Sequence, residues 1–212
     1  IICQKLNMNF CELNDEEIWL ITRLYFFVFA SALVSIYYFK KKNKKATSLT
    51  LFYSFIIAAS GWEIWMTYGL WDGLSVNSRR TEALNCAIPQ NLNWIFNSMG
   101  DLLVVWIGLM LLKFWFKNSK AYLYKWNWTA FLILFFWFVS QNIYVETFFY
   151  YQQLGSNGDL SWAPLNPLGS YYNPVLFTII DRPVTFQTQS TWFLMSPIIY
   201  SLIIYLNNKY HF

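Results

Sequence analysis

Three carboxylates interrupt the long apolar runs of this sequence: Glu63, Asp101 and Glu146. A charge near the centre of a bilayer costs about 2.5 to 3.5 kcal/mol on insertion-derived scales, so each acid needs a partner, a proton or water. Acids in such positions commonly line proton or substrate pathways, which makes these three the candidate catalytic residues. The alternative is structural pairing with arginines, for which the candidates are Arg23, Arg79, Arg80 and Arg182.

Helical spacing places further polar side chains beside these acids, because residues three or four apart share one face of a helix. Asn93, Asn97 and Asp101 follow one another at four-residue steps, with Ser98 next to them. The other candidates for ligand contact are Trp62, Gln141, Asn142 and Trp192. Together these residues predict a pocket with a polar floor and aromatic walls in the outer half of the bundle, open toward the outer leaflet or outer surface, of the kind that binds small molecules between bundle helices. The alternative for the amides and serines is interhelical hydrogen bonding, worth about 0.6 kcal/mol on average.

The composition indicates that the elements carrying these residues lie in lipid. Of 212 residues, 57% are hydrophobic and only 12% are charged, whereas soluble globular domains have roughly 25% charged residues. Runs of about 20 apolar residues are long enough to cross a bilayer. Five such runs are predicted as spans, over residues 18–39, 48–71, 92–116, 126–150 and 190–207. The predicted fold class is all-α, a five-helix polytopic membrane bundle in which residues 1–212 form one domain.

The basic residues predict how the bundle is oriented, because cytoplasmic loops are enriched in lysine and arginine. With the first residue outside and the last inside, Lys5 and the four arginines fall on the outer side. Ten lysines then fall on the inner side: Lys40, Lys41, Lys42, Lys44, Lys45, Lys113, Lys117, Lys120, Lys125 and Lys209. The distribution predicts an N-out, C-in protein of a bacterial inner membrane or a eukaryotic endomembrane. It also explains the net charge of +4 without nucleic acid as a partner.

The connection between the fourth and fifth spans, residues 151–189, is long and rich in proline, glycine and aromatic residues. Its prolines break helices, whereas its aromatic content is too high for a disordered linker. We expect an ordered cap over the outer face, with a short interfacial helix over Pro174 to Ile180. Loops of this length inside a compact fold are commonly functional.

The cysteines and the single histidine limit the chemistry that the chain can perform. Cys3, Cys11 and Cys86 are all assigned to the outer side, where a bridge from Cys11 to Cys86 is one of the pairings that an oxidising compartment allows. His211 lies in the predicted inner tail, and no lysine lies near the middle of a span. These placements argue against haem, histidine-ligated metals and a retinal Schiff base, so no metal and no cofactor is expected.

The order of these features along spans two to five resembles the emopamil-binding, or EXPERA, group of sterol isomerases and sterol-binding proteins. The resemblance rests on Glu63, on Asp101, on the stretch QNIYVETFF around Glu146, and on Gln189 to Trp192 followed by Ser196-Pro197. It implies five helices around a membrane cavity that holds a sterol-like ligand. It further implies that acids move a proton to and from a double bond while a tryptophan faces the developing cation.

These observations favour a membrane-embedded protein that binds an apolar small molecule, such as a sterol, an isoprenoid or another lipid. Isomerase activity through Glu63, Asp101 and Glu146 is a finer version of the same hypothesis, and whether the protein is an enzyme stays open. The alternative is a non-catalytic accessory subunit whose partners are other membrane proteins. A proton-coupled transporter comes third, because five unrepeated spans do not suggest the inverted repeats common in transporters.

Overall fold

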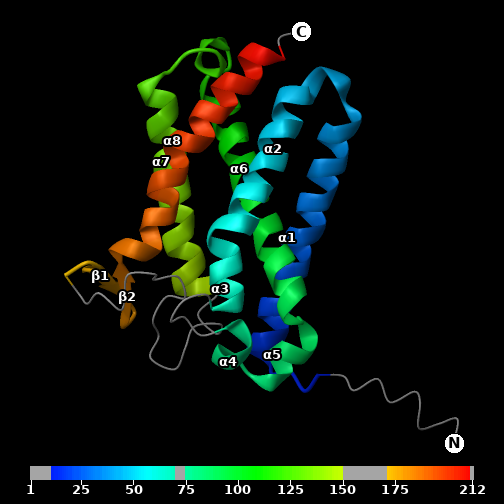
Figure 1. Cartoon of the computed structure of the whole chain (residues 1–212), viewed down its shortest axis with the longest axis vertical. Coiled ribbons are helices and arrows are strands. Elements are labelled where there is room, and N and C mark those ends of the chain that lie inside the picture. Colours follow the sequence, from blue (N-terminus) through cyan, green and yellow to red (C-terminus); the bar gives the residue numbers. More distant parts are fainter. Residues whose placement is uncertain (1–10, 70–74, 150–170, 211–212) are drawn as a thin grey trace, which may run out of the picture.

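Five helical segments long and apolar enough to cross a membrane run side by side in the computed structural model of the chain (Figure 1). They are α1 (Asp15–Lys40), a second segment over Lys42–Tyr68, α6 (Gln90–Trp115), a fourth segment over Trp128–Phe149 and α8 (Phe186–Lys209). The structure describes residues 11–69, 75–149 and 171–210, without the side chain of Glu146. Each predicted span is found close to its expected ends, and the five helices indicate a membrane-embedded protein.

The second and fourth segments are not uniform α-helices. The second consists of η2 (Lys42–Lys44), α2 (Lys45–Ala58), η3 (Ala59–Glu63) and α3 (Ile64–Tyr68), and the fourth of α7 (Trp128–Tyr144) and η5 (Val145–Phe149). Both η3 and η5 are π-helical turns, in which the helix locally widens by one residue. Such turns inside α-helices are frequent at functional sites, and each of these two contains one of the predicted catalytic acids.

The two ends of the bundle carry different connections. One end, at the top of Figure 1, holds the lysine-rich turn η2, the short helix η4 (Ala121–Leu123) and the end of α8; we call it the lysine end. The opposite end holds the short helices α4 (Val76–Arg79) and α5 (Glu82–Ala87) and the strands β1 (Val175–Ile179) and β2 (Arg182–Thr185). We call this the cap end. The separation of lysines from the cap elements agrees with the pattern expected from the sequence.

The cap end is fastened to the start of α1. Cys11 and Cys86 form a disulfide that joins the residues before α1 to α5. The Thr81 hydroxyl donates a hydrogen bond to the buried carboxylate of Glu17, which also takes part in the capping box at the start of α1. The pairing of Cys11 with Cys86, which the sequence allowed without selecting it, is therefore the one that forms.

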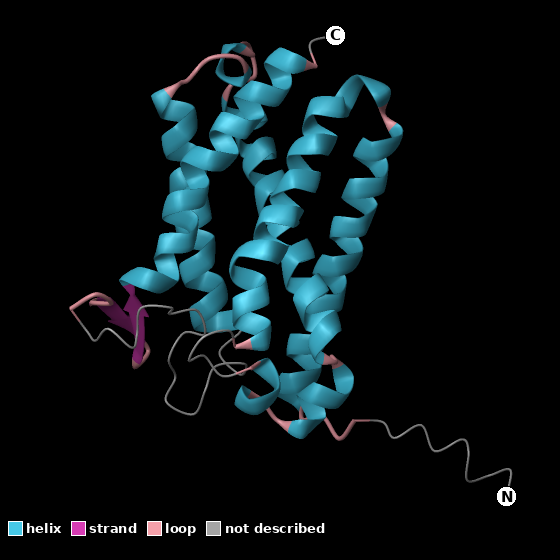
Figure 2. Cartoon of the chain, viewed as in Figure 1, coloured by secondary structure: helices cyan, strands magenta, loops and turns pink. Residues whose placement is uncertain are grey.

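The segment Pro174 to Ile180 is not a helix, so that prediction was wrong. Residues 175–179 instead form β1, which pairs antiparallel with β2 in the hairpin drawn in magenta in Figure 2. The strand contains Val, Phe, Thr and Ile, which favour extended backbone. The turn residues Ile180 and Asp181 have φ values of 49° and 60°, as a two-residue hairpin turn of the primed type requires. This hairpin is an addition to the predicted all-α class, and residues 151–170 of the expected cap lie outside the described part of the chain.

The main core lies between α2, α6, α7 and α8, where Leu51, Leu112, Leu134, Phe138 and Tyr200 are almost fully buried. At the lysine end the Tyr200 hydroxyl donates to the carbonyl of Tyr122, with 2.9 Å between the oxygens, and accepts from the backbone N–H of Asn127. Burial raises the pKa of Tyr122, whose ring stacks on Phe116. These contacts hold the connection between α6 and α7 against α8.

Close packing of α6 on α7 depends on the absence of a side chain at Gly108. A Cβ atom there would lie 2.9 Å from Leu134 Cδ2 and 3.2 Å from Phe138 Cε1. We therefore predict that Gly108→Ala lowers the free energy of unfolding by about 1–3 kcal/mol, the usual effect of overpacking. Gly100→Ala is the matched control, because a Cβ on that residue of α6 has no heavy atom within 4 Å. Unfolding of both variants in mixed micelles measures the difference, and equal stability of the two would contradict this account of α6–α7 packing.

Candidate functional site

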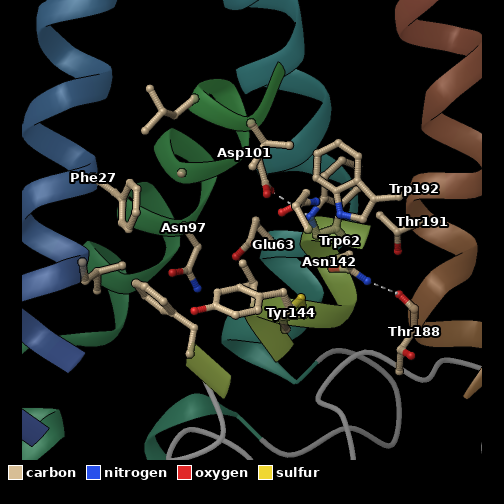
Figure 3. Close-up of a pocket in the computed structure, with 18 of the residues that line it drawn as sticks. Phe27, Trp62, Glu63, Asn97, Asp101, Asn142, Tyr144, Thr188, Thr191 and Trp192 are labelled. Carbon is tan, nitrogen blue, oxygen red and sulfur yellow. Dashed lines mark hydrogen bonds between the residues drawn. The ribbon is translucent and has the colours of Figure 1, made fainter. Parts of the chain in front are cut away.

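A cavity of about 330 Å³ opens inside the cap-end half of the bundle, between α1, α3, α6, α7 and α8; we call it the central cavity. Its volume is in the range of small-molecule pockets. Eight residues predicted as catalytic or ligand-binding line it, together with one predicted pairing arginine: Glu63, Asp101, Asn93, Asn97, Trp62, Gln141, Asn142, Trp192 and Arg79. Figure 3 shows Glu63 and Asp101 near its centre, with Phe27 on the side of α1 and Thr191 and Trp192 on the side of α8.

Asp101 is held in the cavity wall by a tryptophan. Trp62 Nε1 donates a hydrogen bond to Asp101 Oδ2 at 2.9 Å. The Trp62 ring packs against Trp192 with centroids 5.6 Å apart, and Trp192 packs against Phe138 at 5.0 Å. An indole N–H can only donate, so a carboxylate oxygen is a suitable acceptor for it. The described contacts therefore give Asp101 an indole partner, rather than the arginine that the structural alternative required.

Glu63 lies at the end of the π-helical turn η3 and is 4% exposed. Arg79, on α4, lines the same cavity, and its guanidinium donates a hydrogen bond to the carbonyl of Met66. Burial lowers the pKa of Arg79 to about 10, while the nearby Glu63 carboxylate opposes this shift. Arg79 thus remains a cation at neutral pH. Its electrostatic interaction with Glu63 is an acid–arginine pairing of the kind that the structural alternative expects.

The third predicted acid cannot be placed in the cavity. Glu146 lies within η5, whose backbone is described, but its side chain is outside the described part of the chain. Its neighbours Val145 and Phe149 line the cavity. The second π-helical turn therefore borders the site, as the first one does.

Two of the predicted amides, Asn93 and Asn142, also link separate segments of the chain, whereas Gln141 bonds within its own helix. Asn142 Nδ2 donates to the carbonyl of Thr188 at 3.1 Å and to Gln189 Oε1 at 2.9 Å, which joins α7 to α8. Asn93 Oδ1 accepts from Arg80 at 3.1 Å, and Gln141 Nε2 donates to the carbonyl of Phe138 at 2.9 Å. For Asn93 and Asn142 the interhelical hydrogen bonding foreseen as the alternative is therefore present, at residues that still face the cavity.

Ser98 does not line the cavity. Its hydroxyl is fully buried and donates to the carbonyl of Trp94, one turn earlier on its own helix, at 2.7 Å. A serine whose hydroxyl donates to a carbonyl of its own helix has its hydrogen-bond donor satisfied without a ligand. Ser98 directly follows Asn97 and is therefore rotated from it by about 100° around the helix axis, which takes it to the edge of the stripe that faces the cavity.

Several lining residues were missed by sequence reasoning. Thr188 and Thr191 come from the first turns of α8, which begins at Phe186 and not at Ser190 as predicted. Thr188 lies three residues before Thr191 and four before Trp192, and this helical spacing was the signal that would have found it. Further missed residues are the aromatic and aliphatic side chains Leu24, Phe27, Trp137, Tyr144 and Phe149. These are indistinguishable in sequence from lipid-facing residues.

The arginines at the cap end mainly bind main-chain carbonyl groups. Arg80 donates to Asn85 Oδ1 at 2.6 Å, to Asn93 and to the carbonyl of Ile88. Arg182 donates to the carbonyl of Thr147 within η5. Such carbonyls at irregular helix turns need donors, because their intrahelical partners are missing. The described hydrogen bonds of Arg80 and Arg182 thus go to side-chain amides and backbone carbonyls, and their pairing with acids stays a prediction.

Comparison of the chain with protein-family models, with curated proteins and with solved structures finds no match. The chemistry of the site therefore follows from its own residues. Among the described residues, two carboxylates, one arginine, several amides and two threonines line a cavity otherwise walled by aromatic and aliphatic side chains. This combination suits a largely apolar molecule with a small polar part.

We predict that Arg80→Lys destabilises the cap end by about 2 kcal/mol. Lysine keeps the charge but cannot reproduce the fork of donors that bonds three acceptors, and hydrogen bonds to charged groups are worth about 1.5–3 kcal/mol. Burial, followed by the charge of Arg79, lowers the pKa of Arg80 to about 10, so the native guanidinium is charged at neutral pH.

Arg23→Lys is the matched control, because among the described residues Arg23 donates a hydrogen bond only to the Trp19 carbonyl of its own helix, and it covers the rings of Trp19 and Phe149. Its loss should cost less than about 1 kcal/mol, as cation–π contacts of this kind do. Chemical denaturation in detergent compares the two. An equal loss in both variants would show that the three acceptors around Arg80 contribute nothing specific.

Proposed function

We propose that the protein is an integral membrane protein that binds an apolar small molecule in the central cavity, such as a sterol, an isoprenoid or another lipid. The observation that supports this most is the convergence of two acids and an aromatic wall on one cavity inside the apolar bundle. A purely structural set of buried acids has no need of a cavity, since packed side chains would satisfy the same helices. The ligand's polar group would face Asp101, Asn97 and Gln141, and its apolar body would lie against the aromatic wall.

A double-bond isomerase is the second candidate. Glu63 and Asp101 come from neighbouring helices and line the same cavity, so one carboxyl group can donate a proton while the other removes one. Trp62 and Trp192 present aromatic rings to the same space, and such rings stabilise a developing cation. The order of features that resembles the emopamil-binding group leads to the same candidate.

We also propose that the cap end faces outside the cell or into the lumen, with the amino terminus on that side. The lysine end carries the residues that favour the cytoplasm. The disulfide between Cys11 and Cys86 supports the same orientation, because disulfides persist in oxidising compartments and are rare in the cytosol. Charge and redox chemistry are independent reasons for one arrangement.

Filling the central cavity should remove the ligand without unfolding the protein. A Cβ on Gly100 meets no heavy atom within 4 Å, and Gly100 lines the cavity, so Gly100→Leu projects into the space proposed for the ligand. Protein purified in mild detergent is extracted and the lipids are identified by mass spectrometry. We expect the lipid enriched with the native protein to fall by about tenfold or more, which corresponds to about 1.4 kcal/mol of lost affinity.

Gly61→Leu is the matched control, because a Cβ there is equally free of contacts but Gly61 does not line the cavity. Loss of the lipid in both variants, or no enriched lipid with the native protein, would overturn the proposed binding function. A stoichiometric membrane subunit in place of a lipid would favour the accessory role.

Proton transfer is tested on the same preparation in deuterated water. If the acids isomerise a double bond, the native protein incorporates deuterium into the bound lipid, and Asp101→Asn slows this by about 100-fold or more. Asparagine retains an oxygen that can accept the Trp62 hydrogen bond, so the loss would come from the missing acid. Binding without deuterium incorporation would reject the isomerase and leave the binding function intact.

The orientation predicts which end an impermeant maleimide reaches in intact cells. Asn77 is exposed on α4 at the cap end, and Ser119 is exposed at the lysine end. In a Cys3→Ser background, Asn77→Cys should be labelled from outside, whereas Ser119→Cys should be labelled only after permeabilisation. The reverse pattern would show that the cap end faces the cytoplasm.

A further inference from the structure

The hairpin of β1 and β2 presents large apolar side chains that the rest of the described chain does not cover. Val175, Leu176 and Phe177 on β1 are 56%, 45% and 44% exposed, and Ile180 in the turn is 69% exposed. Successive residues of a strand point to opposite faces. A bulge between Val175 and Phe177 interrupts this alternation, but the next pair, Phe177 and Thr178, is exposed at both residues. Both faces of β1 are therefore open, whereas a hairpin that packs on a protein core would bury one of them.

An uncovered apolar hairpin of this kind is not expected to be stable in water. Two isolated strands are at best marginally stable there, and contiguous exposed apolar patches mark interaction surfaces. Tyr171 and Tyr172, just before β1, are also exposed. Tyrosine is enriched at the boundary between water and lipid, because its ring is apolar and its hydroxyl is polar.

The position of the hairpin next to a membrane-spanning helix indicates what covers its apolar surface. β2 ends at Thr185 and α8 begins at Phe186, so the hairpin is joined without a linker to the first turn of a membrane-spanning helix. Figures 1 and 2 show it projecting sideways from the bundle at the cap end, away from α4 and α5. Its apolar surface continues onto α8, where Phe186 and Leu194 are exposed.

We infer that this hairpin is an interfacial anchor, which lies in the headgroup and upper acyl layer of the leaflet at the cap end. Its occupant is the lipid surface itself, since the exposed patch is continuous with the lipid-facing surface of α8. The bilayer covers Leu176, Phe177 and Ile180 and so removes from water the surface that the protein leaves open.

The charges of the hairpin indicate that apolar burial, and not electrostatic attraction, drives this contact. Asp181 in the turn is exposed, and Arg182 is directed to the carbonyl of Thr147 in η5. The surface therefore lacks the cluster of basic residues by which proteins recognise anionic lipids. The hairpin should therefore insert to the same depth in neutral and in anionic membranes.

The anchor also touches the wall of the central cavity. Through Arg182 the hairpin bonds to η5, and Val145 and Phe149 of η5 line that cavity. A hairpin held at a fixed depth in the leaflet would fix the position of this wall relative to the lipid from which an apolar ligand comes.

Spin labels measure the depth of the hairpin directly. The full chain in a Cys3→Ser background is reconstituted in phosphatidylcholine vesicles, with nitroxides on Phe177→Cys or Ile180→Cys. Asn77→Cys, exposed on α4, is the water-facing control, and Leu194→Cys, exposed on α8, is the lipid-facing control. Accessibility to oxygen and to a water-soluble nickel complex is compared for each label, and the disulfide from Cys11 to Cys86 is checked to confirm folding.

We expect the labels at 177 and 180 to favour oxygen over nickel by several-fold, between the values at 77 and 194. The same ratio is expected when anionic phosphatidylglycerol is added to the vesicles. Labels at 177 and 180 that match position 77 would overturn the anchor. Labels shielded from both reagents would also overturn it, because a protein partner or a second copy would then cover the hairpin.

Discussion

Polar groups inside this bundle need partners within the chain or in its cavity, because the surrounding hydrocarbon layer offers no water to replace a missing partner. The hydrogen bond from Trp62 to Asp101 is the clearest result of that constraint, since it places an indole N–H and a carboxylate on facing helices and orients both toward the central cavity. Asn142 meets the same requirement between α7 and α8. Polar residues therefore determine where the helices approach each other at the cap end, and the cavity lies among them.

The same constraint applies to the two π-helical turns in the cap-end half of the bundle. The π-helical turns η3 and η5 disturb the main-chain hydrogen bonding of their helices, and arginines bind carbonyls in or beyond them, at Thr147 for Arg182 and at Met66 for Arg79. The disulfide and the contact between Glu17 and Thr81 then fasten α5 to α1. The result is a cavity whose walls are held by fixed contacts rather than by the uniform packing of apolar helices, as preorganised binding sites require.

The central cavity shows how far single residues could be predicted. Asp101, Asn97 and Asn93 were found because four-residue steps on a long helix leave little doubt about which residues share a face. Ser98 was assigned to the same face by proximity alone and lies off it. Phe27 and Tyr144 were not found, because an aromatic residue that lines an internal cavity has the same sequence signal as one that faces lipid. The hairpin was mistaken for a helix because residues 175–179 form a short apolar run, and periodicity alone does not distinguish a strand from a helix in so short a run.

The sequence alone determined that the chain forms five apolar helices and that its lysines gather at one end, because span length and loop charge are local properties that need no knowledge of packing. It also determined that Glu63 and Asp101 are buried in apolar helices and need partners. Only the tertiary structure decided that the two acids share one cavity, that Trp62 is the partner of Asp101, and that Cys11 pairs with Cys86. Those outcomes depend on how each helix is rotated about its axis and where a π-helical turn shifts that rotation, and only contacts between distant segments set these angles.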